Sequence, residues 1–351
     1  MMEEYTTTTR STVRAALALL LAALAAGPAG AEMALPPGFT AEVHVTGTGF
    51  DRGGQSGESG IPAAMTLAVD ADGALYLAAS GNRYGRAEAE RVLSRVYRIP
   101  PGGARLTPDT AARYAYGPPL PNPEVGAVSR PGELFLTTAD ADRRIGVVYR
   151  LRDGRIELFA GGTPAAGGRP VFRQPEGVAL DAAGNVYVAD RIRGVVVKLD
   201  PAGRLLEPQL GGLRVARARM LAMGPRDELW IAGDGTADQP WQDGTGQIWR
   251  LGPTGSPRLA FDGPHAAAIA IGPGGTLFVA QRHTGRIVAL AGDGPPVEFA
   301  RFTGEQPRTL AFGPSGDLFV VSLAPHTWYL NQVVRVSGPF AGFPGRPAGS
   351  P

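Results

Sequence analysis

Two glutamates, Glu124 and Glu176, stand at equivalent places in two repeated units of the chain, and Asn122 and Gln174 precede them by two residues. Carboxylate and amide oxygens are ligands that Ca²⁺ takes in proteins. A carboxylate near a reacting group can also serve as a general base. The spacing therefore predicts either a divalent-cation site at Glu124 and Glu176 or a catalytic role for the pair. A Ca²⁺ shell would need water or backbone oxygen to complete it.

Arginines and a further amide stand at the matching positions of other units: Arg217, Arg219, Gln306 and Arg308. A guanidinium group donates paired hydrogen bonds to anions and to hydroxylated ligands. These side chains are therefore candidates for holding a small polar ligand. The same arginines could instead form a ring of ion pairs with the glutamates that only makes the fold rigid. Both interpretations stay open at the level of sequence.

His265 precedes the first strand of the fifth unit, where an imidazole could accept a proton from a substrate hydroxyl near neutral pH. A single histidine before a strand also serves as a capping or packing residue. Two tryptophans, Trp241 and Trp328, fall in long loops on the side of the unit that carries these positions. We expect them to form a rim that binds ligand, with coverage of hydrophobic sheet edges as the alternative.

A repeated unit must position these residues, and it is clearest between Arg173 and Leu206. Apolar runs at Gly177–Leu180, Asn185–Ala189 and Val195–Leu199 alternate with turn residues, and a fourth run begins near Leu205. The turn between the first two runs recurs about every 40 to 60 residues, the spacing of four-stranded propeller blades. Its six positions are Gly73, Gly132, Gly184, Asp227, Gly275 and Gly316.

The pattern predicts an all-β protein, a six-bladed β-propeller. Third strands are expected at Val96–Ile99, Val147–Leu151, Val195–Leu199, Ile248–Leu251, Ile287–Leu290 and Val333–Val336, and fourth strands in the first five units. The sixth unit lacks a fourth strand, and we expect Thr40–Val45 to supply it and close the ring, because an open sheet edge invites aggregation. The predicted divisions are a signal peptide (1–31), the closing strand with a Gly/Ser-rich loop (32–60), the propeller (61–338) and a Pro/Gly-rich tail (339–351).

Composition and the first residues restrict the cellular setting. The formal net charge is +2 and the basic residues are dispersed, which argues against nucleic-acid binding. The chain has no cysteine, so disulfides and lipidation on cysteine are excluded. Arg10 and Arg14 precede the apolar run Ala15–Ala26 and the small residues Ala29-Gly30-Ala31, which predicts a removable secretory signal, with an uncleaved anchor as the alternative. We expect a periplasmic or secreted monomer without a membrane span after cleavage.

The segment PEGVALDAAGNVYVAD, Pro175 to Asp190, followed by GVVVKLD, resembles an NHL repeat. The six-unit ring, from Phe39 to about Gly338, is similar to the superfamily of NHL proteins, regucalcin-type gluconolactonases and strictosidine synthases. A second resemblance joins LPPGFTAEV, Leu35 to Val43, to quinone-dependent glucose or sorbosone dehydrogenases. The fold is what these motifs specify, since this superfamily contains both binding proteins and enzymes.

Each resemblance implies a particular axial site. Regucalcin-type lactonases hold a catalytic divalent metal with acidic and amide side chains at the axis, whereas here Met65 and Arg219 stand at two such positions. The quinone-dependent dehydrogenases use an axial histidine as base, for which His265 is the candidate. Two functions therefore remain. The first is an exported propeller that binds a small polar molecule or an exported protein on its axial face. The alternative is a metal-dependent hydrolase or lactonase, or a quinone-dependent sugar dehydrogenase.

Overall fold

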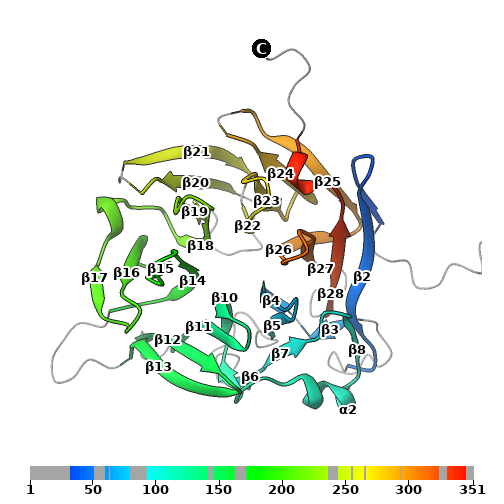
Figure 1. Cartoon of the computed structure of the whole chain (residues 1–351), viewed down its shortest axis with the longest axis horizontal. Helices are drawn as coiled ribbons and strands as arrows, with labels where there is room; N and C mark the ends of the chain where they lie inside the picture. The colour runs from blue at the N-terminus through cyan, green and yellow to red at the C-terminus, as the bar shows by residue number, and fades with distance from the viewer. Residues whose placement is uncertain are drawn as a thin grey trace, which may run out of the picture.

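The computed structural model describes residues 32–50, 60–62, 64–79, 93–140, 145–162, 171–235, 244–253, 256–264, 266–292, 294–323 and 330–344. Six antiparallel sheets stand around a common axis (Figure 1), so the predicted six-bladed propeller is confirmed. The inner strands contact their neighbours in a closed ring. In chain order they are β4 (Ala64–Val69), β10 (Glu124–Arg130), β14 (Pro175–Leu180), β18 (Ala218–Met223), β22 (Ala268–Ile271) and β26 (Gln306–Phe312).

Each inner strand pairs with a second strand that is covered by neighbouring blades on both faces, so its sequence is an apolar run rather than an alternating one. All five residues of β15 (Val186–Asp190) are buried, as are those of β19 (Leu229–Gly233). The other second strands are β5 (Leu75–Ala79), β11 (Glu133–Asp140), β23 (Leu277–Gln281) and β27 (Leu318–Leu323). Gly184 (φ +81°) and Asp227 (φ +55°) occupy the same left-handed turn position before these strands, which explains the recurring glycine.

Third and fourth strands complete the blades close to the predicted ranges. The third strands are β7 (Val96–Ile99), β12 (Ile145–Arg152), β16 (Val195–Leu199), β20 (Thr245–Leu251), β24 (Arg286–Leu290) and β28 (Leu330–Ser337). The fourth strands of the second to fifth blades are β13 (Arg155–Gly161), β17 (Leu205–Glu207), β21 (Pro257–Pro264) and β25 (Val297–Thr303). Two short strands, β6 (Leu93–Ser94) and β9 (Leu120–Pro121), pair with each other.

The first blade does not have the expected fourth strand in the described residues. The segment that follows β7, β8 (Ala104–Leu106), pairs in parallel with the closing strand of the sixth blade, with Val45 opposite Ala104. The outer edge of β7 keeps one isolated bridge, from Tyr97 to Ala115, at the end of the short helices α2 (Pro108–Ala111) and η2 (Ala112–Tyr114). The segment expected as the fourth strand of the first blade therefore extends the sheet that closes the ring.

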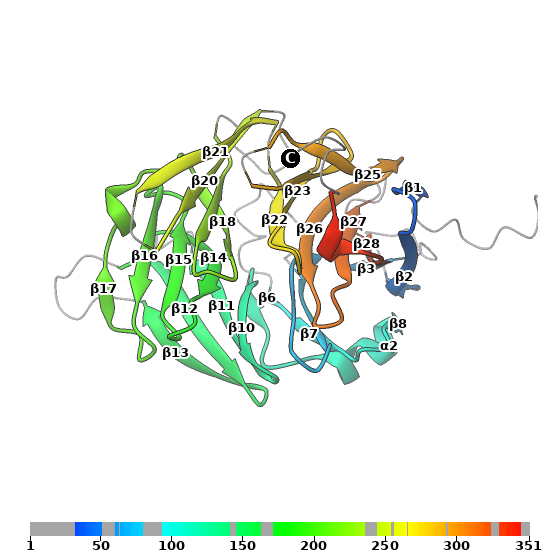
Figure 2. The same cartoon turned by 45° about the horizontal axis from the view of Figure 1, so that its top comes forward.

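The N-terminal closing strand is confirmed. Strand β2 (Thr40–Gly47) pairs antiparallel with β28, placing Thr40 opposite Ser337, and β3 (Ile61–Pro62) also joins β28. A strand that the sequence did not suggest, β1 (Glu32–Ala34), adds to the outer edge of β25. Figure 2 shows β1 and β2 next to β25 and β28 at the outside of the ring. The predicted signal, residues 1–31, lies outside the described residues.

The segment after residue 338 is not a simple tail. Phe340, in the 3₁₀ turn η5 (Phe340–Gly342), is 1% exposed. Its ring centroid lies 4.9 Å from that of Phe39 and 5.2 Å from that of Phe299, so both ends of the propeller domain pack on the fifth blade. Another 3₁₀ turn, η3 (Leu210–Gly212), links the third and fourth blades. Among the described residues no helix has the length and hydropathy needed to cross a membrane.

Candidate functional site

Charged side chains gather at the end of the axis where the inner strands begin. Glu124 is the first residue of β10, and Glu176 and Arg219 are each the second residue of β14 and β18. Because the inner strands all start at this end, their first residues meet around one opening. We call the cluster the axial mouth, and it consists of Glu124, Glu176, Arg191, Arg219, Asp234 and Arg308.

Asp234 joins two arginines in the axial mouth. Its Oδ1 accepts a hydrogen bond from Nε of Arg219 at 2.9 Å, and its Oδ2 accepts one from Nε of Arg191 at 3.1 Å. The Asp234 side chain is 1% exposed and that of Arg219 is 7% exposed. Arg219 also donates through Nη2 to the carbonyl oxygen of Ala267 on the next blade. Arg219 and Arg191 are thus hydrogen-bonded to Asp234, an acid that was not among the predicted residues.

The two glutamates are less completely paired. Gln174 donates through Nε2 to Oε1 of Glu176 at 2.7 Å, and Nε of Arg191 lies 3.7 Å from the same oxygen. Nε of Arg219 is 4.0 Å from Oε2 of Glu176, beyond hydrogen-bond distance. Within the described residues, the buried Oε2 atoms of Glu176 and Glu124 have no hydrogen-bond partner. Each carboxyl group therefore has one buried oxygen that can accept or donate a further hydrogen bond.

Burial sets the protonation of this pair. Burial raises the pKa of Glu176 well above its ordinary value of 4.5, and the nearby Glu124 raises it further, against the opposing effect of Arg219 and Arg191. The pKa of Glu124 is also raised by burial, although Arg219 and Arg308 oppose the shift. Both shifts favour a proton on the pair, so it can donate hydrogen bonds as well as accept them.

The arginine of the same cluster keeps its charge for the opposite reason. Burial alone would lower the pKa of Arg219, but the carboxylate of Asp234, followed by those of Glu176 and Glu124, raises it above its ordinary value. Its positive charge is therefore a fixed feature of the axial mouth. A fixed guanidinium beside a protonable carboxyl pair offers both donors and acceptors to a ligand.

Three other residues predicted for the site, Gln306, Arg217 and Asn122, lie within the described residues. Gln306 accepts a hydrogen bond from Nε of the buried Arg282 at 3.1 Å. Arg217 adopts a left-handed backbone (φ +54°), and its carbonyl oxygen accepts from the N–H of Asp234 at 3.2 Å. Asn122 is also left-handed (φ +40°) in the turn before β10. His265, Trp241 and Trp328 lie outside the described residues, so their predicted roles stay predictions.

Three charged residues, the buried Asp234 and Arg282 and the partly buried Arg191, were missed by the sequence analysis. Each directly follows a second strand, after Asp190, Gly233 and Gln281 respectively. The signal was present as a polar residue at the end of a fully apolar run in three successive units.

The axial mouth is a poor match to the metal that the lactonase resemblance implies. Among the described residues there is no group of three or more His, Cys, Asp or Glu side chains placed to hold a metal ion. The two glutamates face the guanidinium groups of Arg191 and Arg219, whose positive charge would repel a cation. The donor set therefore suits a ligand with hydroxyl groups better than Ca²⁺, which prefers six or more oxygen ligands.

Comparisons with known proteins agree with this fold. The NHL repeat family matches residues 172–195. Comparison of the sequence with curated proteins finds no match. Among solved structures, the chain is similar to a glucose dehydrogenase with 12% identity and a TM-score of 0.56, over 86% of this chain and 100% of that one. It is also similar to a gluconolactonase-like protein with 17% identity and a TM-score of 0.54, over 87% and 93% of the two chains.

A streptogramin B lyase aligns with 15% identity and a TM-score of 0.50, over 86% of this chain and 98% of that one. Identities this low show the fold alone. The chain is a six-bladed β-propeller, and residues 172–195 match the NHL repeat family.

Proposed function

We propose that the axial mouth binds a small hydroxylated molecule of the size and polarity of a monosaccharide. One observation carries the proposal. The buried Oε2 atoms of Glu124 and Glu176, on neighbouring inner strands, have no hydrogen-bond partner within the described residues. Leaving a buried polar atom unpaired costs about 1 to 3 kcal/mol. A ligand hydroxyl placed between the two carboxyl groups would supply the partners that these atoms lack.

The charges around the pair support a hydroxylated ligand rather than a bare cation. Arg191 and Arg219 lie within 4.0 Å of Glu176 and are both held by Asp234, so their guanidinium groups keep fixed positions. Preorganised donors of this kind bind sugar hydroxyls without a cost for reorientation. Glucose dehydrogenase and gluconolactonase-like propellers share the fold, and a sugar-like ligand is consistent with their names.

Isothermal titration calorimetry with D-glucose, D-gluconate and glucono-1,5-lactone tests the proposal. We expect at least one of these probes to bind, and Glu124→Gln and Glu176→Gln each to weaken that binding about tenfold, the effect of one charge-assisted hydrogen bond. The matched control is Glu157→Gln, an exposed glutamate on β13. Absence of binding for all three probes, or equal losses in the control, would remove support for a hydroxylated ligand.

Cation binding at the axial mouth can be tested in the same protein. Thermal unfolding with Ca²⁺, Mg²⁺, Mn²⁺, Zn²⁺ and a chelator reports any cation that binds the folded state, because such binding raises the melting temperature. We expect no shift that depends on Glu124 and Glu176. A cation-specific shift that a Glu124→Gln, Glu176→Gln double variant abolishes would instead support the metal-dependent alternative.

Catalysis at the same mouth is the second candidate, and the raised pKa values of Glu124 and Glu176 favour it. Two carboxyl groups that share a proton can act as acid and base on one substrate. Glucono-1,5-lactone hydrolysis and dye-coupled glucose oxidation are the assays, with and without added Ca²⁺ and quinone. A rate above background that Glu176→Gln abolishes would make the protein an enzyme. A rate unchanged by this substitution would exclude the pair as its catalytic residues.

We also propose that the protein is exported and that residues 1–31 are removed. The basic, apolar and small-residue segments of this stretch support the proposal. Cell fractionation followed by N-terminal sequencing tests it, and the expected first residue is Glu32, where β1 begins. Recovery of the full-length chain in the cytoplasmic or membrane fraction would contradict export with cleavage. Binding of an exported protein to the axial face stays a prediction.

A further inference from the structure

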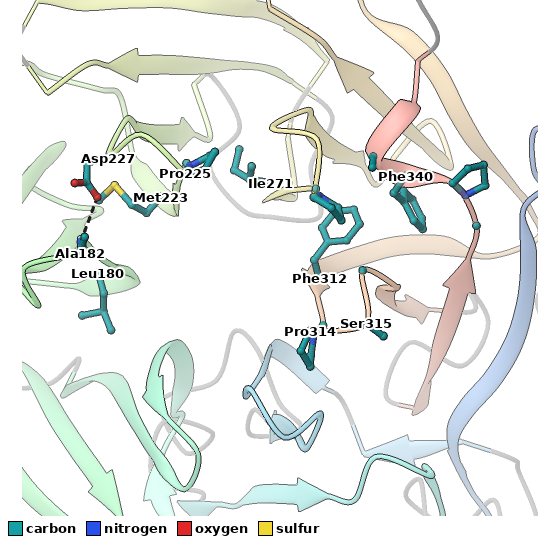
Figure 3. A pocket seen from close by; sticks show the side chains of 18 of the residues that line it. Leu180, Ala182, Met223, Pro225, Asp227, Ile271, Phe312, Pro314, Ser315 and Phe340 are labelled. Carbon is teal, nitrogen blue, oxygen red and sulfur yellow. Dashed lines mark hydrogen bonds between the residues drawn. The ribbon is translucent and has the colours of Figure 1, made fainter.

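A hollow of about 850 Å³ lies at the opposite end of the inner strands from the axial mouth. The apolar side chains Leu180, Met223, Ile271 and Phe312, at the ends of β14, β18, β22 and β26, line it together with Phe340 (Figure 3). We call this hollow the basin. Its volume is within the range of small-molecule pockets, which are mostly apolar with a few polar groups.

The sequence builds the basin from four successive blades. Each inner strand ends in a large apolar residue, and the turn that follows contributes small residues and, in three of the blades, a proline: Pro225, Pro273 and Pro314. Three of these turns begin with glycine. A side chain would not fit at Gly272 or Gly313, because a Cβ there would come within 3.0 Å of the ring of Phe278 or Phe319. The apolar lining is therefore repeated from blade to blade.

The charged side chains in the described lining of the basin are all acidic. Its described lining contains two carboxylates, Asp181 and Asp227, and no lysine, arginine or histidine. The Asp181 carboxylate accepts hydrogen bonds from the backbone and side chain of Asn185 and from the hydroxyl of Tyr187. Both of its oxygens are therefore used within its own blade. Asp227 is exposed, and its Oδ1 accepts one hydrogen bond, from the N–H of Ala182 at 3.2 Å.

Figure 3 shows Asp227 at one end of the basin, next to Met223. The neighbouring Arg226 lies beside another acid, with Nη2 at 4.0 Å from Oε1 of Glu228. An acidic apolar hollow stands out in a chain whose formal net charge is +2. Nζ of Lys198 lies 4.0 Å from Oδ2 of Asp181, so Asp227 is the acid of the lining that can face a bound cation.

We propose that the basin binds a small organic cation, an amine carried on an aromatic or aliphatic body. The body would pack against Met223, Ile271 and Phe312, and the ammonium group would lie toward Asp227. Methionine adapts to ligands of varied shape, and aromatic rings attract cations at their faces. This site is separate from the axial mouth, so it does not depend on the function proposed there.

Three probes with the same aromatic body and different charge test the proposal: 2-phenylethylamine, benzyl alcohol and phenylacetate. By isothermal titration calorimetry we expect the amine to bind at least about fivefold more tightly than either other probe, as expected for one exposed charge pair. Added salt should reduce this preference by screening. Asp227→Asn should remove most of it, because asparagine accepts the same backbone conformation and can still bond Ala182.

Asp153→Asn is the matched control, since Asp153 is also exposed and left-handed (φ +50°) but lies in the β12–β13 turn, outside the basin. It should leave the preference for the amine intact. Phe312→Leu should weaken all three probes alike, and Glu176→Gln, at the axial mouth, should affect none. Equal binding of the three probes, absence of binding by the amine, or equal effects of Asp227→Asn and Asp153→Asn would each overturn the proposal.

Discussion

The side chain of Arg219, in β18, donates from Nε to Oδ1 of Asp234 across 2.9 Å. Asp234 directly follows β19 of the same blade, and both side chains are almost fully buried. Asp234 at the same time accepts from Arg191 of the third blade. This carboxylate therefore connects two blades at the end of the axis that also carries the glutamate pair.

Removal of Asp234 should strongly destabilise the fold. Asp234→Ala leaves the buried Arg219 without this carboxylate, and removing one partner of a buried ion pair costs about 3 to 5 kcal/mol. Urea unfolding of the variant and the parent measures the difference. Glu298→Ala is the control, because Glu298 and Arg301 form a half-exposed ion pair on β25 and its loss should cost at most about 1 kcal/mol. Equal losses in the two variants would contradict the role of Asp234 as a buried connector.

Glu176→Gln should stabilise the protein increasingly as the pH rises. The pKa of Glu176 in the folded state is raised above its ordinary value of 4.5 by burial and by Glu124. Between these two values the folded state binds more protons than the unfolded state, so stability falls as the pH rises through this window. Glutamine does not titrate, and it removes this loss. Urea unfolding of parent and variant from pH 4 to 8 should show a difference that grows with pH.

Asp317→Asn provides the opposite trend as a control. Burial would raise the pKa of Asp317, but hydrogen bonds from Ser315 and Arg335 lower it below its ordinary value of 3.8. Its stabilising contribution is therefore present above pH 3.8 and lost as the pH falls through the folded-state pKa. The advantage of the parent over Asp317→Asn should shrink in acid. A Glu176→Gln difference that shrinks as the pH rises would contradict the raised pKa of Glu176.

Tyr187→Phe should cost about 1 kcal/mol, the net value of a typical hydrogen bond. The Tyr187 hydroxyl donates to Oδ2 of Asp181 at 3.0 Å, and Tyr76 donates in the same way to Asp70 in the first blade. Thermal or urea unfolding measures the loss. Tyr149→Phe is the control, because the Tyr149 hydroxyl has no hydrogen-bond partner within the described residues, and it should be close to neutral. An effect of equal size in both variants would assign the loss to packing.

Phe340→Ala should destabilise the protein by about 3 to 5 kcal/mol, the usual cost of truncating a buried phenylalanine. Its ring packs on Phe39 and Phe299 and joins the C-terminal segment to the N-terminal one. Leu206→Ala, at a residue 53% exposed, should change stability by less than about 0.5 kcal/mol. Differential scanning calorimetry separates the two. A neutral Phe340→Ala would mean that the segment after residue 338 is dispensable for the fold.

The repeat made the fold predictable because each blade carries the same local information. Turn glycines such as Gly184, apolar second strands and the unpaired segment Thr40–Val45 together specify six blades and their closure. The loss of the fourth strand from the first blade was not predictable, because Ala104–Leu106 has the pattern of a strand whichever neighbour it joins. Its choice of β2 depends on contact across two blades.

The candidate site was predictable in part. Comparing equivalent positions brought Glu124, Glu176 and Arg219 together, because equivalent residues of a propeller must meet at its axis. The same comparison did not give the protonation of the pair, since that depends on burial and on charges from other blades.

The sequence by itself determined a six-bladed propeller, the strand that closes it and an end of the axis that gathers carboxyl, amide and guanidinium groups. Periodic local patterns carry that information, because each blade folds by hydrogen bonds between strands that are neighbours in the chain. Only the tertiary structure decided that Asp234 holds Arg191 and Arg219 and that an acidic apolar basin lies at the opposite end. It also decided that two buried carboxyl oxygens have no hydrogen-bond partner in the part of the chain that the structure describes. These properties arise between blades, where pairing, burial and the sign of the local charge depend on residues far apart in the chain.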